Sequence, residues 1–123
     1  MGINTIVIDD NKELLTCFVE LLQFSNVNVI DTGRNGKEAA ELYQKHRPDI
    51  LFMDIEMPQY DGLYGLQKIK EYDPNATVVL VSGSVNVEEK FEEYGATAVL
   101  PKPFDMKKVK DIINKISIHQ NYA

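Results

Sequence analysis

Short apolar runs rich in β-branched residues alternate with amphipathic stretches along the chain, and this alternation constrains the fold more than any other feature. Runs such as 6–8, 50–53 and 78–81 are continuously apolar, as expected of strands buried on both faces of a sheet. Repeated strand–helix units are typical of a parallel sheet with helices on both faces. The predicted strands are 5–9, 27–31, 49–54, 77–82 and 97–100.

Five helices are predicted between and after these strands. The first should bury one face, because its apolar residues recur at helical spacing: Leu14, Leu15, Phe18, Leu21 and Leu22. Cys17 lies within this pattern, and we expect it to be buried as a small apolar residue. The predicted helices are 12–24, 35–46, 63–72, 87–94 and one that opens after Asp105 as its N-cap, with an apolar face formed by Met106, Val109, Ile112, Ile113 and Ile116.

Five parallel strands of this kind usually adopt the doubly wound order 2-1-3-4-5. The switch point of that order lies between strands 1 and 3, and ligands bind there, outside the carboxyl ends of the strands. The fold class is therefore α/β, and the order indicates where functional residues should gather.

Length and charge narrow the classes of function. A chain of 123 residues fits one domain over 1–123, with no output domain. A net charge of −6 disfavours nucleic acid and anionic membranes as partners. No apolar run approaches the ~20 residues that span a bilayer, and the N-terminal residues lack a basic start followed by an apolar stretch. We expect a cytoplasmic protein that binds cations and other proteins.

Polar residues follow the apolar runs at the predicted switch point. Asp9 and Asp10 end the first strand, Asp54 ends the third, Ser82 ends the fourth, and Lys102 follows the fifth. Three neighbouring carboxylates repel one another unless a positive charge lies among them. Oxygen ligands favour Mg²⁺ or Mn²⁺, and the absence of nearby His or Cys argues against zinc. A metal and a lysine that face a carboxylate suit phosphoryl transfer.

These residues resemble the response regulator receiver family of two-component signalling. The matching segments cover most of the chain: 8–11 (Ile-Asp-Asp-Asn), 53–58 (Met-Asp-Ile-Glu-Met-Pro), 61–62 (Asp-Gly), 82–83 (Ser-Gly) and 102–104 (Lys-Pro-Phe). The resemblance implies a flavodoxin-like fold in which Asp54 accepts a phosphoryl group.

The resemblance also implies the role of each site residue. Asp10, Asp54 and the backbone carbonyl of Glu56 would bind Mg²⁺, with Asp9 helping through water. Lys102 and Ser82 would contact the phosphoryl group, with Ser82 moving inward, and the peptide between Lys102 and Pro103 is expected to be cis.

The implied partners are proteins. A sensor histidine kinase would donate the phosphoryl group, and a downstream target or a phosphotransfer protein would respond. The chain would be a switch that assists its own phosphorylation and dephosphorylation rather than an enzyme, and a phosphorylation-dependent homodimer stays open.

The sequence departs from the family pattern at two places, and Glu56 occupies a further position that varies in the family. The family usually has Tyr or Phe three positions before the lysine, where its ring reports the active state, but this chain has Val99. Pro101 precedes Lys102 and should stiffen that loop. The side chain of Glu56 could contact the lysine or the attacking water.

Other functions fit the residues less well. A phosphatase of the haloacid dehalogenase type needs a second Asp two residues after its nucleophile, where this chain has Glu56. A flavin-binding protein needs a hydroxyl-rich loop after the first strand, where this chain has carboxylates. A receiver that acts without phosphorylation and a phosphorelay intermediate remain alternatives.

Overall fold

The computed structural model describes the backbone of residues 2–83, 88–103 and 105–122, and their side chains except those of 88–90 and 117–122. Five parallel strands form one sheet in the order β2-β1-β3-β4-β5, as predicted. The strands are β1 (Ile3–Ile8), β2 (Val27–Gly33), β3 (Ile50–Asp54), β4 (Val78–Ser82) and β5 (Ala98–Pro101). The helices are α1 (Lys12–Phe24), α2 (Gly36–His46), α3 (Gly62–Tyr72), α4 (Glu88–Glu93) and α5 (Met106–Tyr122).

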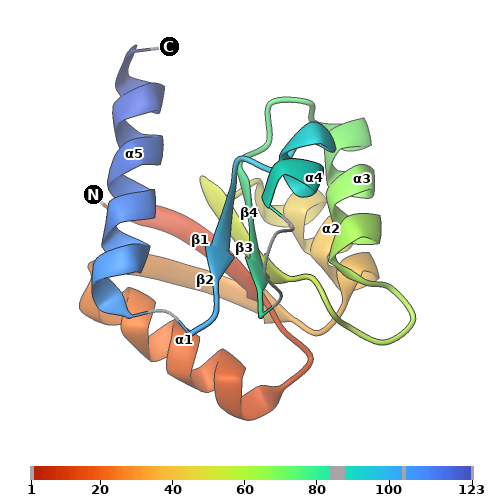
Figure 1. Ribbon diagram of the computed structural model, residues 1–123, viewed down its shortest axis with the longest axis horizontal. Coiled ribbons are helices and arrows are strands. Elements are labelled where there is room, and N and C mark those ends of the chain that lie inside the picture. The colour runs from red at the N-terminus through yellow and green to blue at the C-terminus, as the bar shows by residue number, and fades with distance from the viewer. Residues whose placement is uncertain (1, 84–87, 104, 123) are drawn as a thin grey trace.

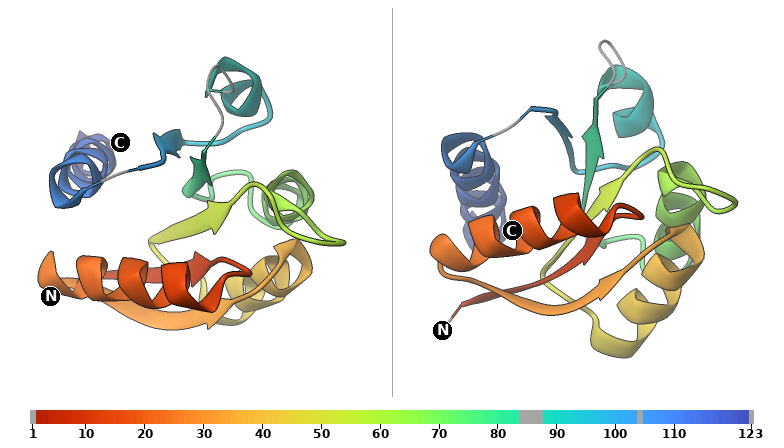
Figure 2. Two further views of the ribbon diagram at one scale, coloured as in Figure 1. Left: turned by 60° about the horizontal axis from the view of Figure 1, so that its bottom comes forward. Right: turned by 90° about the horizontal axis from the view of Figure 1, so that it is seen from below.

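Helices cover both faces of the sheet. Helices α1 and α5 lie on one face, and α2, α3 and α4 lie on the other (Figure 1). Two further views show the same division (Figure 2). Successive side chains of a strand point to opposite faces, so β3 sends Phe52 toward the α1–α5 side and Met53 toward the α2–α3–α4 side. The core is therefore divided into two hydrophobic clusters with the sheet between them.

Polar caps begin four of the helices. In each, the side chain of the N-cap residue accepts a hydrogen bond from the backbone N–H three residues later, which satisfies a donor that the helix itself leaves unpaired. The pairs are Asn11 with Leu14, Asn35 with Glu38, Asp61 with Tyr64, and Asp105 with Lys108. The Asp105 cap was predicted, and Asn35 proves to be the cap of α2 rather than its first residue.

Helix α1 differs from its prediction at two apolar positions. Phe18 and Leu22 are buried against the sheet, but Leu14 is 48% exposed and Cys17 is exposed as well. The prediction that Cys17 is buried is therefore wrong. The apolar stripe of α1 is wider than the surface that the sheet covers, so its outer edge faces solvent.

The remaining predicted boundaries agree with the structure to within two residues at nearly every strand and helix end. The start predicted for the fourth helix, Val87, lies outside the described residues. Within the described part of the chain, no helix is long and apolar enough to cross a membrane.

Tyr43 on α2 connects to the end of α3 through Asp73. Its hydroxyl donates a hydrogen bond of 2.8 Å to Oδ2 of Asp73, and this bond is the main reason that the pKa of Asp73 lies below its ordinary value of 3.8. A carboxylate with a lowered pKa stabilises the native state above the unfolded pKa and loses that contribution as the pH falls through the folded pKa.

Substitution Tyr43→Phe removes this donor and retains the ring. We expect a lower free energy of unfolding at pH 7, and the difference from the unchanged protein should shrink as the pH falls below 3.8 and Asp73 becomes protonated. Urea titrations across a pH series measure the difference. A difference that stays constant down to the acid unfolding limit would show that Asp73 is not the relevant acceptor.

Candidate functional site

Three carboxylates meet at the carboxyl ends of β1 and β3. Asp9 and Asp10 directly follow β1, and Asp54 is the last residue of β3. One oxygen atom of each can be chosen so that all three lie within 4.8 Å of one another. Asp9 and Asp54 are buried, whereas Asp10 is exposed to solvent. The three carboxylates therefore do lie together at the predicted switch point, and the group is exposed to solvent at Asp10.

Backbone hydrogen bonds hold these aspartates in place. The N–H of Asp9 donates to the carbonyl of Gly33 on β2 (3.0 Å), and Oδ1 of Asp9 accepts from the N–H of Asn11 (2.9 Å). Beyond Asp54, the N–H of Ile55 donates to the carbonyl of Val81 on β4 (3.1 Å). The backbone that bears Asp9 and Asp54 is thus held in place by hydrogen bonds to the neighbouring strands.

Lys102 directly follows β5 and also reaches this acidic group. Its Nζ lies 3.4 Å from Oδ2 of Asp54, and its N–H donates to the carbonyl of Ser82 (2.7 Å). Ser82 is buried at the end of β4. The peptide between Lys102 and Pro103 is cis, as predicted, while the next residue of that motif, Phe104, lies outside the described residues.

The pocket carries more negative charge than its own cation balances. Burial raises the pKa of Asp54 above its ordinary value although Lys102 opposes the shift. Burial also raises the pKa of Asp9, with the nearby Asp54 carboxylate adding to the effect. Because one lysine faces three carboxylates, a further cation would stabilise the ionised pocket, and all three side chains offer the oxygen ligands that Mg²⁺ prefers.

Glu56 contributes backbone to the site. The backbone N–H groups of Glu56 and Ile55 lie near enough to the Asp54 carboxylate to oppose the rise in its pKa, and the Glu56 side chain is exposed to solvent. The loop after β3 therefore passes close to Asp54, where a backbone carbonyl could complete a metal site.

A groove beside the carboxylates was not predicted. It has a volume of about 640 Å³ and is lined by Asp9, Leu14, Cys17, Phe18, Leu21, Gly83, Lys102 and Pro103. Most of these residues are apolar, and the groove runs from the acidic pocket along α1. The sequence signal for it was the spacing of Leu14, Cys17 and Leu21, which place a second apolar edge on the helix.

The chain matches the family model of the response regulator receiver domain over residues 5–114. It belongs to the response regulator receiver family. Among curated proteins, it is 32% identical to the chemotaxis protein CheY of Halobacterium salinarum, over 94% of this chain and 98% of that protein. It is also 32% identical to the protein CcdB of Bacillus subtilis, over 93% of this chain and 97% of that protein.

A solved structure supports the same assignment. The chain is similar to a structure described as the CheX–CheY–BeF₃–Mg complex from Borrelia burgdorferi, with a TM-score of 0.87 and 30% identity. The similarity covers 93% of this chain and 88% of that chain. The flavodoxin-like receiver fold expected from the sequence is thereby confirmed.

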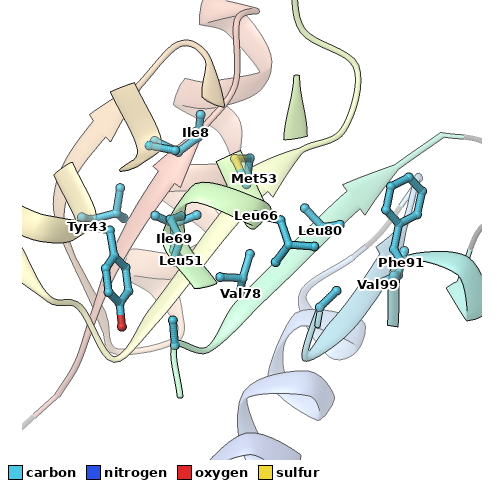
Figure 3. Close-up of a cluster of buried hydrophobic side chains, with 14 of the residues drawn as sticks. Ile8, Tyr43, Leu51, Met53, Leu66, Ile69, Val78, Leu80, Phe91 and Val99 are labelled. Carbon is cyan, nitrogen blue, oxygen red and sulfur yellow. The ribbon is translucent and has the colours of Figure 1, made fainter. Parts of the chain in front are cut away.

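Val99 of this receiver lies where the family usually has an aromatic ring. It is buried on β5, opposite Leu80 of β4, in the cluster on the α2–α3–α4 side. Phe91 of α4 belongs to the same cluster (Figure 3). Pro101, the other departure near Lys102, ends β5 opposite Ser82.

Gly62 holds the loop after β3 against Asp54. Its N–H donates to the carbonyl of Ile55 (2.8 Å), and a Cβ at this position would lie 2.6 Å from the carbonyl oxygen of Asp54 and 2.8 Å from Cα of Ile55. Both obstacles are backbone atoms, which cannot rotate away. The close approach of α3 to the site therefore requires a residue without a side chain.

Substitution Gly62→Ala should force these backbones apart and lower the free energy of unfolding by about 1–3 kcal/mol, as overpacking usually does. The matched control is Gly83→Ala, where a Cβ would meet nothing within 4 Å, and a change within about 0.5 kcal/mol is expected. Urea denaturation of both variants makes the comparison. Equal effects at the two glycines would contradict the role assigned to Gly62.

Proposed function

We propose that this chain is a stand-alone receiver over residues 1–123 that accepts a phosphoryl group on Asp54. A sensor histidine kinase donates the group in a Mg²⁺-dependent reaction in the cytoplasm, and the modified protein changes its contacts with a downstream protein. The observation that carries this proposal is the position of Asp54, between a pair of aspartates and a lysine at the carboxyl end of the sheet. The similar CheY in a complex with BeF₃, Mg and CheX supports it.

Each residue has a role in the proposed reaction. Asp9, Asp10, Asp54 and the backbone carbonyl of Glu56 would hold Mg²⁺ or Mn²⁺. The ion would neutralise charge on the phosphoryl oxygens. An oxygen of Asp54 attacks phosphorus, the bond from phosphorus to the donor nitrogen breaks, and the donor imidazole leaves with a proton from solvent. Lys102 pairs with one phosphoryl oxygen, and the hydroxyl of Ser82 donates a hydrogen bond to another.

Incubation with phosphoramidate and Mg²⁺ should add the mass of one phosphoryl group to the intact protein. The gain should disappear in Asp54→Asn, which keeps the size of the side chain but removes the nucleophilic carboxylate, and it should disappear when EDTA removes the ion. Intact-protein mass spectrometry provides the measurement. A gain that persists in Asp54→Asn would place the acceptor elsewhere, and continuous release of phosphate at enzyme-like rates would favour a phosphatase.

The groove along α1 offers a surface for the protein donor. It begins at Asp9 and Lys102 and continues over Leu14, Cys17 and Leu21, so a partner that covers it brings its reactive group to the acidic pocket. A small phosphodonor needs no such contact. Protein and small donors should therefore respond differently to a change on α1.

Substitution Leu14→Glu should slow transfer from the phosphorylated kinase by at least ~10-fold, since a charge buried without a partner at an interface is costly, and leave phosphorylation by phosphoramidate unchanged. The control is Tyr72→Glu on α3, because Tyr72 is similarly exposed, at 44% against 48% for Leu14. Radiolabel transfer assays measure both rates. Loss of transfer in the control alone, or in neither variant, would remove the groove from the donor interface.

Val99 favours two alternatives within the family. Without a ring on β5, the chain could act without phosphorylation or serve as a phosphorelay intermediate that passes the group on. The phosphoramidate experiment decides against the first if the mass increases. Rapid transfer from phosphorylated Asp54 to a histidine phosphotransfer protein would favour the second.

A further inference from the structure

The loop between β3 and α3 is attached to its surroundings at two places. At its base, the N–H of Gly62 donates to the carbonyl of Ile55 (2.8 Å). Farther along the loop, the carbonyl of Tyr60 accepts a hydrogen bond from the N–H of Gly36, the first residue of α2 (2.6 Å). Glu56, whose backbone carbonyl is the proposed metal ligand, lies between these attachments. The position of that carbonyl therefore depends on Tyr60 as well as on the sheet.

The turn just before Tyr60 has an unfavourable backbone conformation. The N–H of Tyr60 donates to the carbonyl of Pro58 (2.7 Å), which closes a three-residue γ-turn around Gln59. Gln59 has φ of +67°, in the left-handed region that residues with a Cβ atom disfavour. Gln59 is exposed to solvent, so burial does not compensate for this conformation. A γ-turn of this hand persists only when neighbouring contacts hold it.

The side chain of Tyr60 makes such contacts. Its ring packs against the ring of Tyr64 on α3, with centroids 4.9 Å apart and planes inclined at 52°. Nζ of Lys37 on α2 lies 5.8 Å from the centroid of the Tyr60 ring. The tilted aromatic pair and the cation–ring contact are both attractive. One residue of the loop is therefore joined to α2 and to α3.

The start of α2 gives the loop a fixed support. Asn35 caps the helix by accepting from the N–H of Glu38 (2.9 Å). A Cβ at Gly36 would fall against the carbonyl oxygen of Asp61 and would lie 3.1 Å from that of Tyr60. The backbones of α2 and of the loop are thus in direct contact, and a shift of the turn is resisted from this side.

The metal site needs this support at one of its ligands in particular. Mg²⁺ demands near-ideal octahedral geometry, and a ligand contributes most to affinity when it is held in position before the ion binds. Asp54 is the last residue of a strand, and Asp9 is fixed by hydrogen bonds to β2 and to Asn11. The carbonyl of Glu56 belongs to a loop, so its position depends on what holds the loop.

We propose that Tyr60 is a positioning residue for the metal site. Its ring holds the strained turn against α2 and α3, and the turn in turn holds the backbone carbonyl of Glu56 where Mg²⁺ would bind. This inference rests on the proposed function. Tyr60 acts through the loop rather than by touching the ion.

The test is isothermal titration calorimetry of the metal-free full chain with magnesium chloride. Tyr60→Ala should weaken Mg²⁺ binding by about 3- to 10-fold, which corresponds to the loss of one aromatic pair, whereas Tyr60→Phe keeps the ring and should bind like the unchanged protein. Tyr64→Ala removes the partner ring and should weaken binding to a similar extent. The matched control is Tyr72→Ala, which removes a ring at the last residue of α3 that also faces a cation, Arg47 (5.5 Å), and it should leave the affinity unchanged.

A change at the turn separates positioning from packing. Asn adopts the left-handed region more readily than Gln does, so Gln59→Asn added to Tyr60→Ala should recover at least half of the lost affinity on a logarithmic scale. A ring that only stabilised the packing of α3 could not be replaced by a change at an exposed turn residue.

The outcomes distinguish this role from the proposed function. Absence of Mg²⁺ binding in the unchanged protein overturns the metal site of the proposed function, and the role of Tyr60 with it. Normal binding in the unchanged protein with equal affinity in Tyr60→Ala and Tyr64→Ala overturns the positioning role alone. Equal losses in Tyr60→Ala and Tyr72→Ala, or no recovery with Gln59→Asn, overturn it too; thermal scans without metal establish that each variant is folded at the temperature of the titration.

Discussion

The ion pair between Lys102 and Asp54 is the interaction on which the organisation of the site depends. It joins residues that follow β5 and end β3, and the strand between them, β4, contributes Ser82 to the same rim. Asp54 is buried, and burial disfavours its charged form. The lysine offsets part of that penalty, which leaves a carboxylate that is ionisable, rigidly held and still in need of positive charge. A cation bound beside this carboxylate would offset the rest of the penalty.

The order of the strands explains how a short sequence assembles this pocket. Because β1 lies between β2 and β3, residues that are more than forty positions apart, such as Asp9 and Asp54, become neighbours. The close approach of α3 through Gly62 then fixes the loop that carries Glu56. A change in any one of these packing relations would alter the distances between the carboxylates, even if the residues of the site stayed the same.

Much of this could be predicted from the sequence, and the reasons differ by residue. Apolar runs that end in Asp54 or Ser82 place those side chains at one rim as soon as the strands are parallel, so Asp9, Asp10 and Lys102 could be grouped without coordinates. Cys17 could not be placed, because helical periodicity does not reveal how much of a helix the sheet covers. The role of Gly62 depends on how closely the start of α3 approaches the end of β3, and no local pattern encodes that distance.

The division of the core into two clusters has a consequence for how such a protein can change over generations. The sheet separates the cluster beneath α1 and α5 from the cluster beneath α2, α3 and α4, and substitutions without shared contacts usually have additive effects on stability. Variation along the groove of α1 can therefore accumulate with little effect on the packing of Phe91 and Val99. The surface on one side of the sheet can therefore change over generations while the packing on the opposite side stays as it was.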